Sequence, residues 1–78
     1  MDIKILGSGC SKCDKLEAAA RTAVTELGVE AAFDKITDPA EIASWGVMAT
    51  PALVVDDEVV LSGRVASSED IKALLADR

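Results

Sequence analysis

Residues 3–28 of the chain read IKILGSGCSKCDKLEAAARTAVTELG. The aliphatic residues Ile3, Ile5 and Leu6 predict a short buried strand, and the glycines that follow let the backbone turn sharply without a side-chain clash. Apolar residues then recur at three- and four-residue spacing, which predicts an amphipathic helix over residues 11–27 with Gly28 as its C-terminal stop. The segment therefore predicts a strand, a glycine-containing loop and a long helix, with two cysteines where the helix begins.

The middle of the chain predicts a second strand and a short helix. Residues 29–34 alternate apolar with polar or small side chains, the period of two expected of a strand with one wetter face. Asp38 can cap a helix, and Pro39 loses no hydrogen bond at the first helical position. Gly46 is expected to end this helix.

The last third of the chain predicts a hairpin and a final helix. Residues 52–55 form a strand that Asp56-Asp57 turns into a second strand over residues 58–62. Capping side chains and acids at residues 67–70 then precede the apolar stripe of a last helix. The predicted order is βαβαββα, an α/β fold with a four-stranded mixed sheet flanked by three helices. A chain of 78 residues is expected to form a single domain over residues 1–78.

Composition excludes several classes of function. The formal net charge of −6, from 14 acidic against 8 basic residues, disfavours binding to nucleic acid. No apolar run approaches the roughly 20 residues that cross a bilayer, and the first residues lack the features of a secretory leader, so we expect a cytoplasmic protein with no membrane partner. Histidine is absent, which removes the commonest metal ligand and general base.

Cys10 and Cys13 carry the chemistry that the sequence indicates. Three residues apart at the start of a helix, their Cα atoms lie about 5 Å apart, within the roughly 4.4–6.8 Å that a disulfide requires. The positive end of the helix dipole favours the thiolate of the first cysteine, and Lys12 adds to this effect. Lys12 is otherwise a solvated side chain or a contact for acidic partners.

Three other uses of the cysteine pair remain open. As a structural disulfide, the pair would close a very short loop and stabilise the fold by only about 2 kcal/mol. A structural zinc site needs two further ligands, which a second chain would have to supply. Two thiolates on a loop also suit a soft-metal carrier for Cu(I), as in the heavy-metal-associated domain, although this chain has Ser8 where that family has a methionine. The metal carrier is the alternative to a redox function, which itself needs no metal.

The whole chain resembles the thioredoxin and glutaredoxin superfamily. The resemblance rests on Cys10-Ser11-Lys12-Cys13 at the first helix, on Thr50-Pro51 before the hairpin and on the element order. It is closest to the small thioredoxin-like redox-active disulfide proteins of bacteria and archaea. Six residues before Cys10, counted without a gap, this chain has Lys4 at the position where thioredoxins bury an aspartate.

The resemblance implies a thiol-disulfide oxidoreductase. Cys10 is then the attacking thiolate, Cys13 the resolving thiol, and Pro51 a cis-proline that faces the pair, while Thr50 presents backbone groups to a bound substrate. No cofactor is implied beyond the redox-active Cys10-Cys13 disulfide. The implied partners are disulfide-containing protein substrates and an upstream reductase, and we expect a monomer. Without the cysteines, the simpler interpretation is that Pro51 starts an edge strand in the trans form.

The core is predicted from the apolar positions of the expected elements. Trp45 is the single tryptophan, and it either packs at the end of the short helix or lies beside the disulfide. The remaining candidates carry no functional role: Ile3, Ile5, Leu16, Phe33, Leu53, Val55, Leu74 and Leu75.

Overall fold

The computed structural model describes residues 1–7, 11–47 and 49–76. Four strands form one sheet in the order β2-β1-β3-β4. Strands β1 and β2 are parallel, whereas β1 pairs with β3, and β3 with β4, in antiparallel fashion. The strands are β1 Asp2–Leu6, β2 Ala32–Ile36, β3 Ala52–Val55 and β4 Glu58–Ser62.

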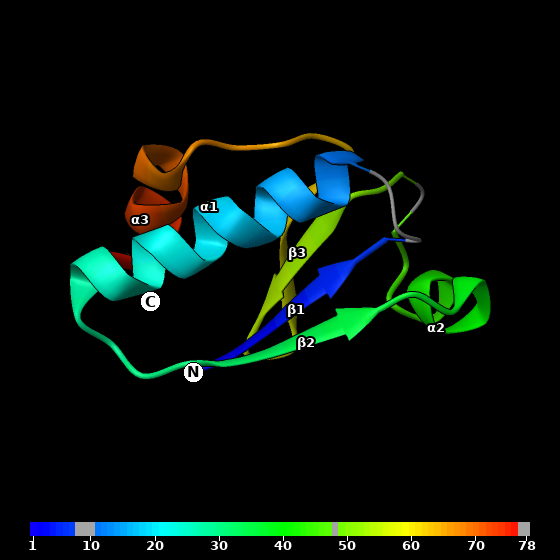
Figure 1. Cartoon of the computed structure of the whole chain (residues 1–78). Coiled ribbons are helices and arrows are strands. Elements are labelled where there is room, and N and C mark those ends of the chain that lie inside the picture. Colours follow the sequence, from blue (N-terminus) through cyan, green and yellow to red (C-terminus); the bar gives the residue numbers. More distant parts are fainter. Residues whose placement is uncertain (8–10, 48, 77–78) are drawn as a thin grey trace.

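Three helices cover the two faces of this sheet. The helices are α1 Ser11–Leu27, α2 Pro39–Ser44 and α3 Ser68–Ala76. Helices α1 and α3 pack on one face, called the first face here, and α2 packs on the second face (Figure 1). The order βαβαββα, the mixed sheet and the three flanking helices confirm the predicted α/β fold class.

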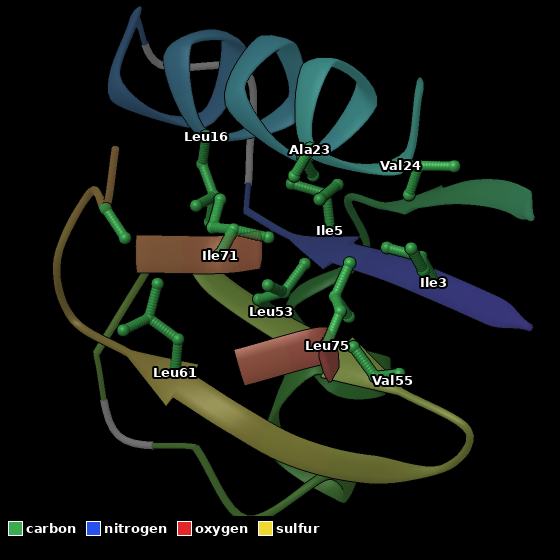
Figure 2. Packing of buried hydrophobic residues seen from close by; sticks show 12 residues of the cluster. Ile3, Ile5, Leu16, Ala23, Val24, Leu53, Val55, Leu61, Ile71 and Leu75 are labelled. Carbon is green, nitrogen blue, oxygen red and sulfur yellow. The ribbon is translucent and has the colours of Figure 1, made fainter. Parts of the chain in front are cut away.

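The larger core lies on the first face, between the sheet and the helices α1 and α3 (Figure 2). Alternate residues of β1 and β3 form the sheet side of this core. Residues of α1 at three- and four-residue spacing form most of its helix side. Each aliphatic side chain fully buried in this way contributes about 1.5–3 kcal/mol. The members are Ile3, Ile5, Leu16, Ala20, Ala23, Val24, Leu53, Val55, Leu61, Ala66, Ile71 and Leu75.

A smaller cluster fills the space between the second face and α2. Its buried members are Leu6, Ile42, Ala52 and Val54, with Trp45 packed against them. Trp45 is half-buried at the C-cap of α2, and the Nζ atom of Lys4 lies 5.6 Å from the centroid of its ring. Trp45 is therefore a packing residue of the second face.

Strand β2 begins later than the sequence pattern predicted. The predicted strand over residues 29–34 is wrong at both ends, since β2 runs from Ala32 to Ile36 and Val29 is 40% exposed. The physical reason is pairing: β2 is an edge strand whose single neighbour is β1, and Asp2, the first residue of β1, lies opposite Ala32. A strand extends only where its neighbour offers hydrogen-bonding groups.

Two predicted core residues are less buried than expected. Phe33 is partly buried, because one side of the edge strand is open, and the guanidinium carbon of Arg21 lies 4.5 Å from the centroid of its ring. Leu74 is also partly exposed on α3. The prediction that both belong to the buried core is therefore wrong, although Phe33 packs against that core.

The predicted helix ends and the hairpin turn are confirmed. The amide of Ala40 donates to the Asp38 carboxylate at 3.0 Å, with Pro39 at the first position of α2. In the hairpin turn, Asp56 and Asp57 have φ angles of 49° and 67°, a left-handed conformation that aspartate tolerates. The turn is tied to β1, because the Asp2 amide donates to the Asp56 carboxylate at 2.9 Å and the Asp56 amide donates to the Asp2 carbonyl at 2.8 Å.

No helix in the described part of the chain is long and apolar enough to cross a membrane.

Ion pairs around Glu17 join α1 to β2. The Glu17 carboxylate lies 3.0 Å from the Nζ atom of Lys35 and 3.0 Å from a guanidinium nitrogen of Arg21. Hydrogen bonds from Lys35 and then from Arg21 lower the pKa of Glu17 below its ordinary value of 4.5. The same contact with Glu17, and a second one with Asp14, raise the pKa of Lys35 above its usual value.

We predict that Glu17→Gln lowers the free energy of unfolding at neutral pH by about 0.5–1 kcal/mol, as expected for exposed ion pairs. A carboxylate whose pKa is lowered by folding stabilises the protein above its unfolded pKa and ceases to do so as the pH falls through its folded pKa. The difference in the free energy of unfolding between wild type and variant should therefore disappear as the pH falls below 4.5. Urea unfolding as a function of pH measures this difference. Glu30→Gln is the matched control, since Glu30 has no ion pair in the described part of the chain. An equal loss in both variants would contradict the prediction.

Candidate active site

Cys13 lies in the first turn of α1 with its side chain turned into the protein. Helical spacing places it on the same side of α1 as Leu16, Ala20, Ala23 and Val24, all of which are buried against the sheet. Only 2% of Cys13 is exposed. The helix periodicity that builds the core therefore also shields this thiol from solvent.

Gly7 lies against the Cys13 sulfur at the end of β1. A Cβ atom at position 7 would overlap the Sγ atom of Cys13 and would lie 3.4 Å from its Cβ atom. The same Cβ atom would lie 3.9 Å from the Cα atom of Pro51. The Gly7 amide donates to the Ile36 carbonyl at 2.9 Å, which fixes this backbone against β2. A side chain at position 7 is therefore disfavoured, because the Cys13 sulfur occupies the place of its Cβ atom, whereas Pro51 lies at ordinary contact distance.

The Thr50-Pro51 segment borders Gly7 directly before β3. The Thr50-Pro51 peptide bond is cis, Pro51 is buried and Thr50 is exposed. The Gly63 amide donates to the Pro51 carbonyl oxygen at 2.9 Å. Gly63 has a φ of +77°, and a Cβ atom there would lie 3.0 Å from that of Ala49, so a side chain is disfavoured at this position as well.

A shallow groove lies beside Thr50 on the α2 side. It has a volume of about 240 Å³. Its lining is mostly apolar and consists of Pro39, Ile42, Ala43, Val47, Ala49 and Thr50. The exposed Thr50 thus stands between this groove and the buried Pro51.

The structure brings together three of the site residues proposed from the sequence, and a fourth lies next to Cys13 on the helix surface. Cys13 and Pro51 meet at Gly7, and Thr50 adjoins Pro51 at the surface. Lys12 is exposed in the first turn of α1. Cys10 lies outside the described residues, as do Ser8, Gly9 and Met48, so the expected position of the Cys10 thiol at the helix start stays a prediction.

Gly7 and Gly63 were missed as site residues by reasoning from the sequence. A glycine directly after a predicted strand was the available signal, since Gly7 follows β1 and Gly63 follows β4. Lys4, which the ungapped count placed at the buried aspartate of thioredoxins, has 22% of its side chain exposed and lies 3.7 Å from a carboxylate oxygen of Asp57. Among residues 1–7, 11–47 and 49–76, no group of three or more acidic or cysteine side chains is placed to hold a metal ion.

Comparison with known proteins identifies the family. The family described as "Thioredoxin domain" matches residues 1–76. A thioredoxin from Methanothermobacter thermautotrophicus is 49% identical over 76 residues, which cover 97% of this chain and 99% of that protein. A thioredoxin from Methanocaldococcus jannaschii is 44% identical over 70 residues, covering 90% of this chain and 80% of that protein.

These matches confirm the resemblance inferred from the sequence and lend no support to a metal carrier. They span the strand, helix and hairpin segments that build the site. The chain belongs to the thioredoxin family.

Proposed function

We propose that this thiol-disulfide oxidoreductase of the thioredoxin family acts through Cys10 as the nucleophile and Cys13 as the resolving thiol. The observation that carries the assignment is the burial of Cys13, whose sulfur contacts the backbone at Gly7. A thiol shielded in this way is a poor nucleophile toward an external disulfide, because the disulfide cannot reach it. The first attack therefore falls to Cys10, three residues earlier in the chain.

The helix start supports the reactivity of Cys10. Cys10 directly precedes the 17-residue helix α1, whose unpaired amide groups and dipole favour a thiolate at its N-terminus. Asp14 in the first turn acts in the opposite sense, but its carboxylate lies 3.4 Å from the Nζ atom of Lys35. The positively charged Lys12 adds to the favourable field.

The proposed reaction is two successive exchanges. The Cys10 thiolate attacks one sulfur of the target disulfide, forms a mixed disulfide and releases the other target sulfur as a thiolate. The Cys13 thiolate then attacks the Cys10 sulfur, which frees the second target thiolate and leaves the Cys10-Cys13 disulfide. Two electrons pass to the target, and an upstream reductase must return them to the dithiol. The reverse sequence oxidises a dithiol target.

Thr50 and Pro51 are proposed to hold the substrate chain. An extended substrate segment can pair with exposed main-chain groups in the manner of an added strand, and Thr50 is exposed next to the buried Pro51. The apolar groove beside Thr50 supports this placement, because it offers room for a substrate side chain. Lys12 is proposed as a positioning charge for the Cys10 thiolate.

The proposed reaction uses only the two cysteines of the chain and a disulfide-containing partner. The Cys10-Cys13 disulfide is the redox group, with no bound metal or organic cofactor. Disulfide-containing proteins are the proposed substrates. We keep a single domain, a monomeric state and a cytoplasmic location as predictions.

The assignment predicts unequal reactivity of the two thiols. Iodoacetamide applied to the reduced protein at mildly acidic pH should modify Cys10 and leave Cys13 unmodified, because only Cys10 is expected to be both accessible and ionised. Mass spectrometry of the digested protein reads out both sites. The same treatment after unfolding in denaturant is the control, where the two thiols should react at similar rates. Preferential labelling of Cys13 in the folded protein would reverse the proposed roles.

The order of the two exchanges predicts a trapped intermediate. Cys13→Ser should accumulate a mixed disulfide between Cys10 and the target, because no second thiol remains to release it. Non-reducing electrophoresis with a disulfide-containing protein substrate detects this species, and a reductant should dissolve it. Cys10→Ser is the matched control and should form no adduct while folded, since Cys13 is shielded. An adduct of equal yield in both variants would refute the assignment.

The approach of Gly7 to Cys13 predicts a coupled loss of stability. Gly7→Ala should lower the free energy of unfolding of the reduced protein by about 1–3 kcal/mol, since the added methyl group must displace the sulfur or the backbone. In a Cys13→Ala background the same substitution should cost much less, because the overlapping sulfur is gone. Urea unfolding of the four proteins under reducing conditions gives this coupling energy. Equal costs in both backgrounds would show that the Cys13 sulfur does not fill the space above Gly7.

A further inference from the structure

The basic side chains that the structure describes fall into two groups. Lys4, Arg21, Lys35 and Lys72 each lie within ion-pair distance of a carboxylate. Three others form no ion pair within residues 1–7, 11–47 and 49–76, and all three are exposed. These three, here called the basic triad, are Lys12, Lys15 and Arg64.

The two sides of α1 differ in charge compensation. Asp14, Glu17 and Arg21 lie on the side toward β2, where Lys35 pairs with both carboxylates. At 3.6 residues per turn, Lys12 lies on the side of α1 opposite to these three residues. Its direction from the helix axis is close to that of Ala23, which is buried in the first-face core further along α1. Lys15 follows Lys12 by three residues and so neighbours it on the helix surface.

Arg64, the third member of the triad, lies near the same end of the protein, because the backbone before it is hydrogen-bonded to Pro51. Arg64 follows Gly63, whose amide donates to the Pro51 carbonyl oxygen at 2.9 Å. Pro51 in turn adjoins Gly7 and thereby Cys13 in the first turn of α1. From Gly63 the chain passes over the start of α1 on its way to α3 (Figure 1). The basic triad therefore lies at the end of the molecule that carries the proposed reactive thiols.

The opposite end of the molecule is acidic. The β3-β4 turn, the start of β1 and the segment before β2 meet there, as the hydrogen bonds of Asp56 with Asp2 and of the chain terminus with Glu30 show. Within the described residues, the positive charges at this end are those of Lys4, which lies 3.7 Å from Asp57, and of the terminal ammonium of Met1, which donates to the Glu30 carbonyl. The carboxylates that gather there include those of Asp2, Glu30, Asp56 and Asp57. At the redox end the uncompensated positive charges thus lie on the side of α1, whereas the exposed Asp38 and Glu41 lie on the other side of the sheet, at the start of α2.

We infer that the basic triad is a docking surface for acidic segments of protein partners, in which carboxylates lie next to the disulfide to be reduced. This inference rests on the proposed function and adds the charge class of the substrate to it. Exposed bases attract carboxylates over about 10 Å at an ionic strength of 0.1 M, and an oppositely charged far end favours approach with the redox end first. Partners with basic segments at the disulfide are disfavoured by the same field.

The test compares two disulfide-bridged peptides of equal length and cysteine spacing, one with glutamates next to the disulfide and one with glutamines at the same places. The readout is the ratio of kcat/KM for the acidic peptide to kcat/KM for the neutral peptide, so that intrinsic differences between the peptides cancel between protein variants. In Lys15→Gln/Arg64→Gln this ratio should fall by roughly two- to thirtyfold, the range for losing two exposed ion pairs. High salt should shrink the ratio in the wild type as well.

The matched control is Thr25→Glu/Ala73→Glu, which changes the net charge by the same amount at exposed helical positions. Thr25 lies about 15 Å along α1 from Lys15, and Ala73 follows Lys72, which pairs with Glu26 near the end of α1 at 2.7 Å. This variant should keep the wild-type ratio. A wild-type ratio unaffected by salt and by the triad substitutions, or an equal fall in the control, would overturn the docking surface while leaving the oxidoreductase intact. Failure to reduce either peptide would overturn the proposed function itself.

Discussion

The approach of the Cys13 sulfur to the backbone of Gly7 is the constraint on which the rest of the site depends. It brings the first turn of α1 directly onto the end of the central strand β1. Pro51 approaches Gly7 from the same side, where its Cα atom would lie 3.9 Å from a Cβ atom, and the Gly63 amide donates to the Pro51 carbonyl oxygen. Segments far apart in the sequence therefore meet around one residue without a side chain, and each contact is made by backbone or by a short side chain. Such a site is set by main-chain packing more than by flexible groups, which limits how far the Cys13 sulfur can move.

The sheet gives this arrangement a rigid base. Strands β1 and β3 are the two central strands, and all four residues of β3 are buried. Their apolar side chains serve both cores, with Leu53 and Val55 in the first-face core and Ala52 and Val54 in the smaller second-face cluster. The positions of Gly7 and Pro51, which adjoin these strands, are thereby fixed from both faces. A site at the ends of buried strands keeps its geometry better than one built on loops alone.

Much of the fold was predictable because its signals are local. The spacing of apolar residues gave α1 its exact bounds, the Asp38-Pro39 pair gave the start of α2, and Asp56-Asp57 gave the turn. The start of β2 was not predictable from its own residues, because it depends on where β1 offers a partner. In the site, spacing and the Thr-Pro pair pointed to Cys13 and Pro51. The need for glycine at position 7 was hidden, since it arises from a contact between β1 and α1 that neither segment encodes alone.

Helix α2 is six residues long, and Ile42 is its one buried residue. Such a short unit is expected to open locally at a smaller free energy than β1 and β3, which are paired with a neighbouring strand on both sides. The groove beside Thr50 is lined in part by Pro39, Ile42 and Ala43 of this helix. One wall of the groove therefore belongs to a short helix with a single buried residue, and the other to Val47, Ala49 and Thr50 in the segment before β3. A wall of that kind adapts to side chains of different shape while the sulfur chemistry next to it keeps its geometry.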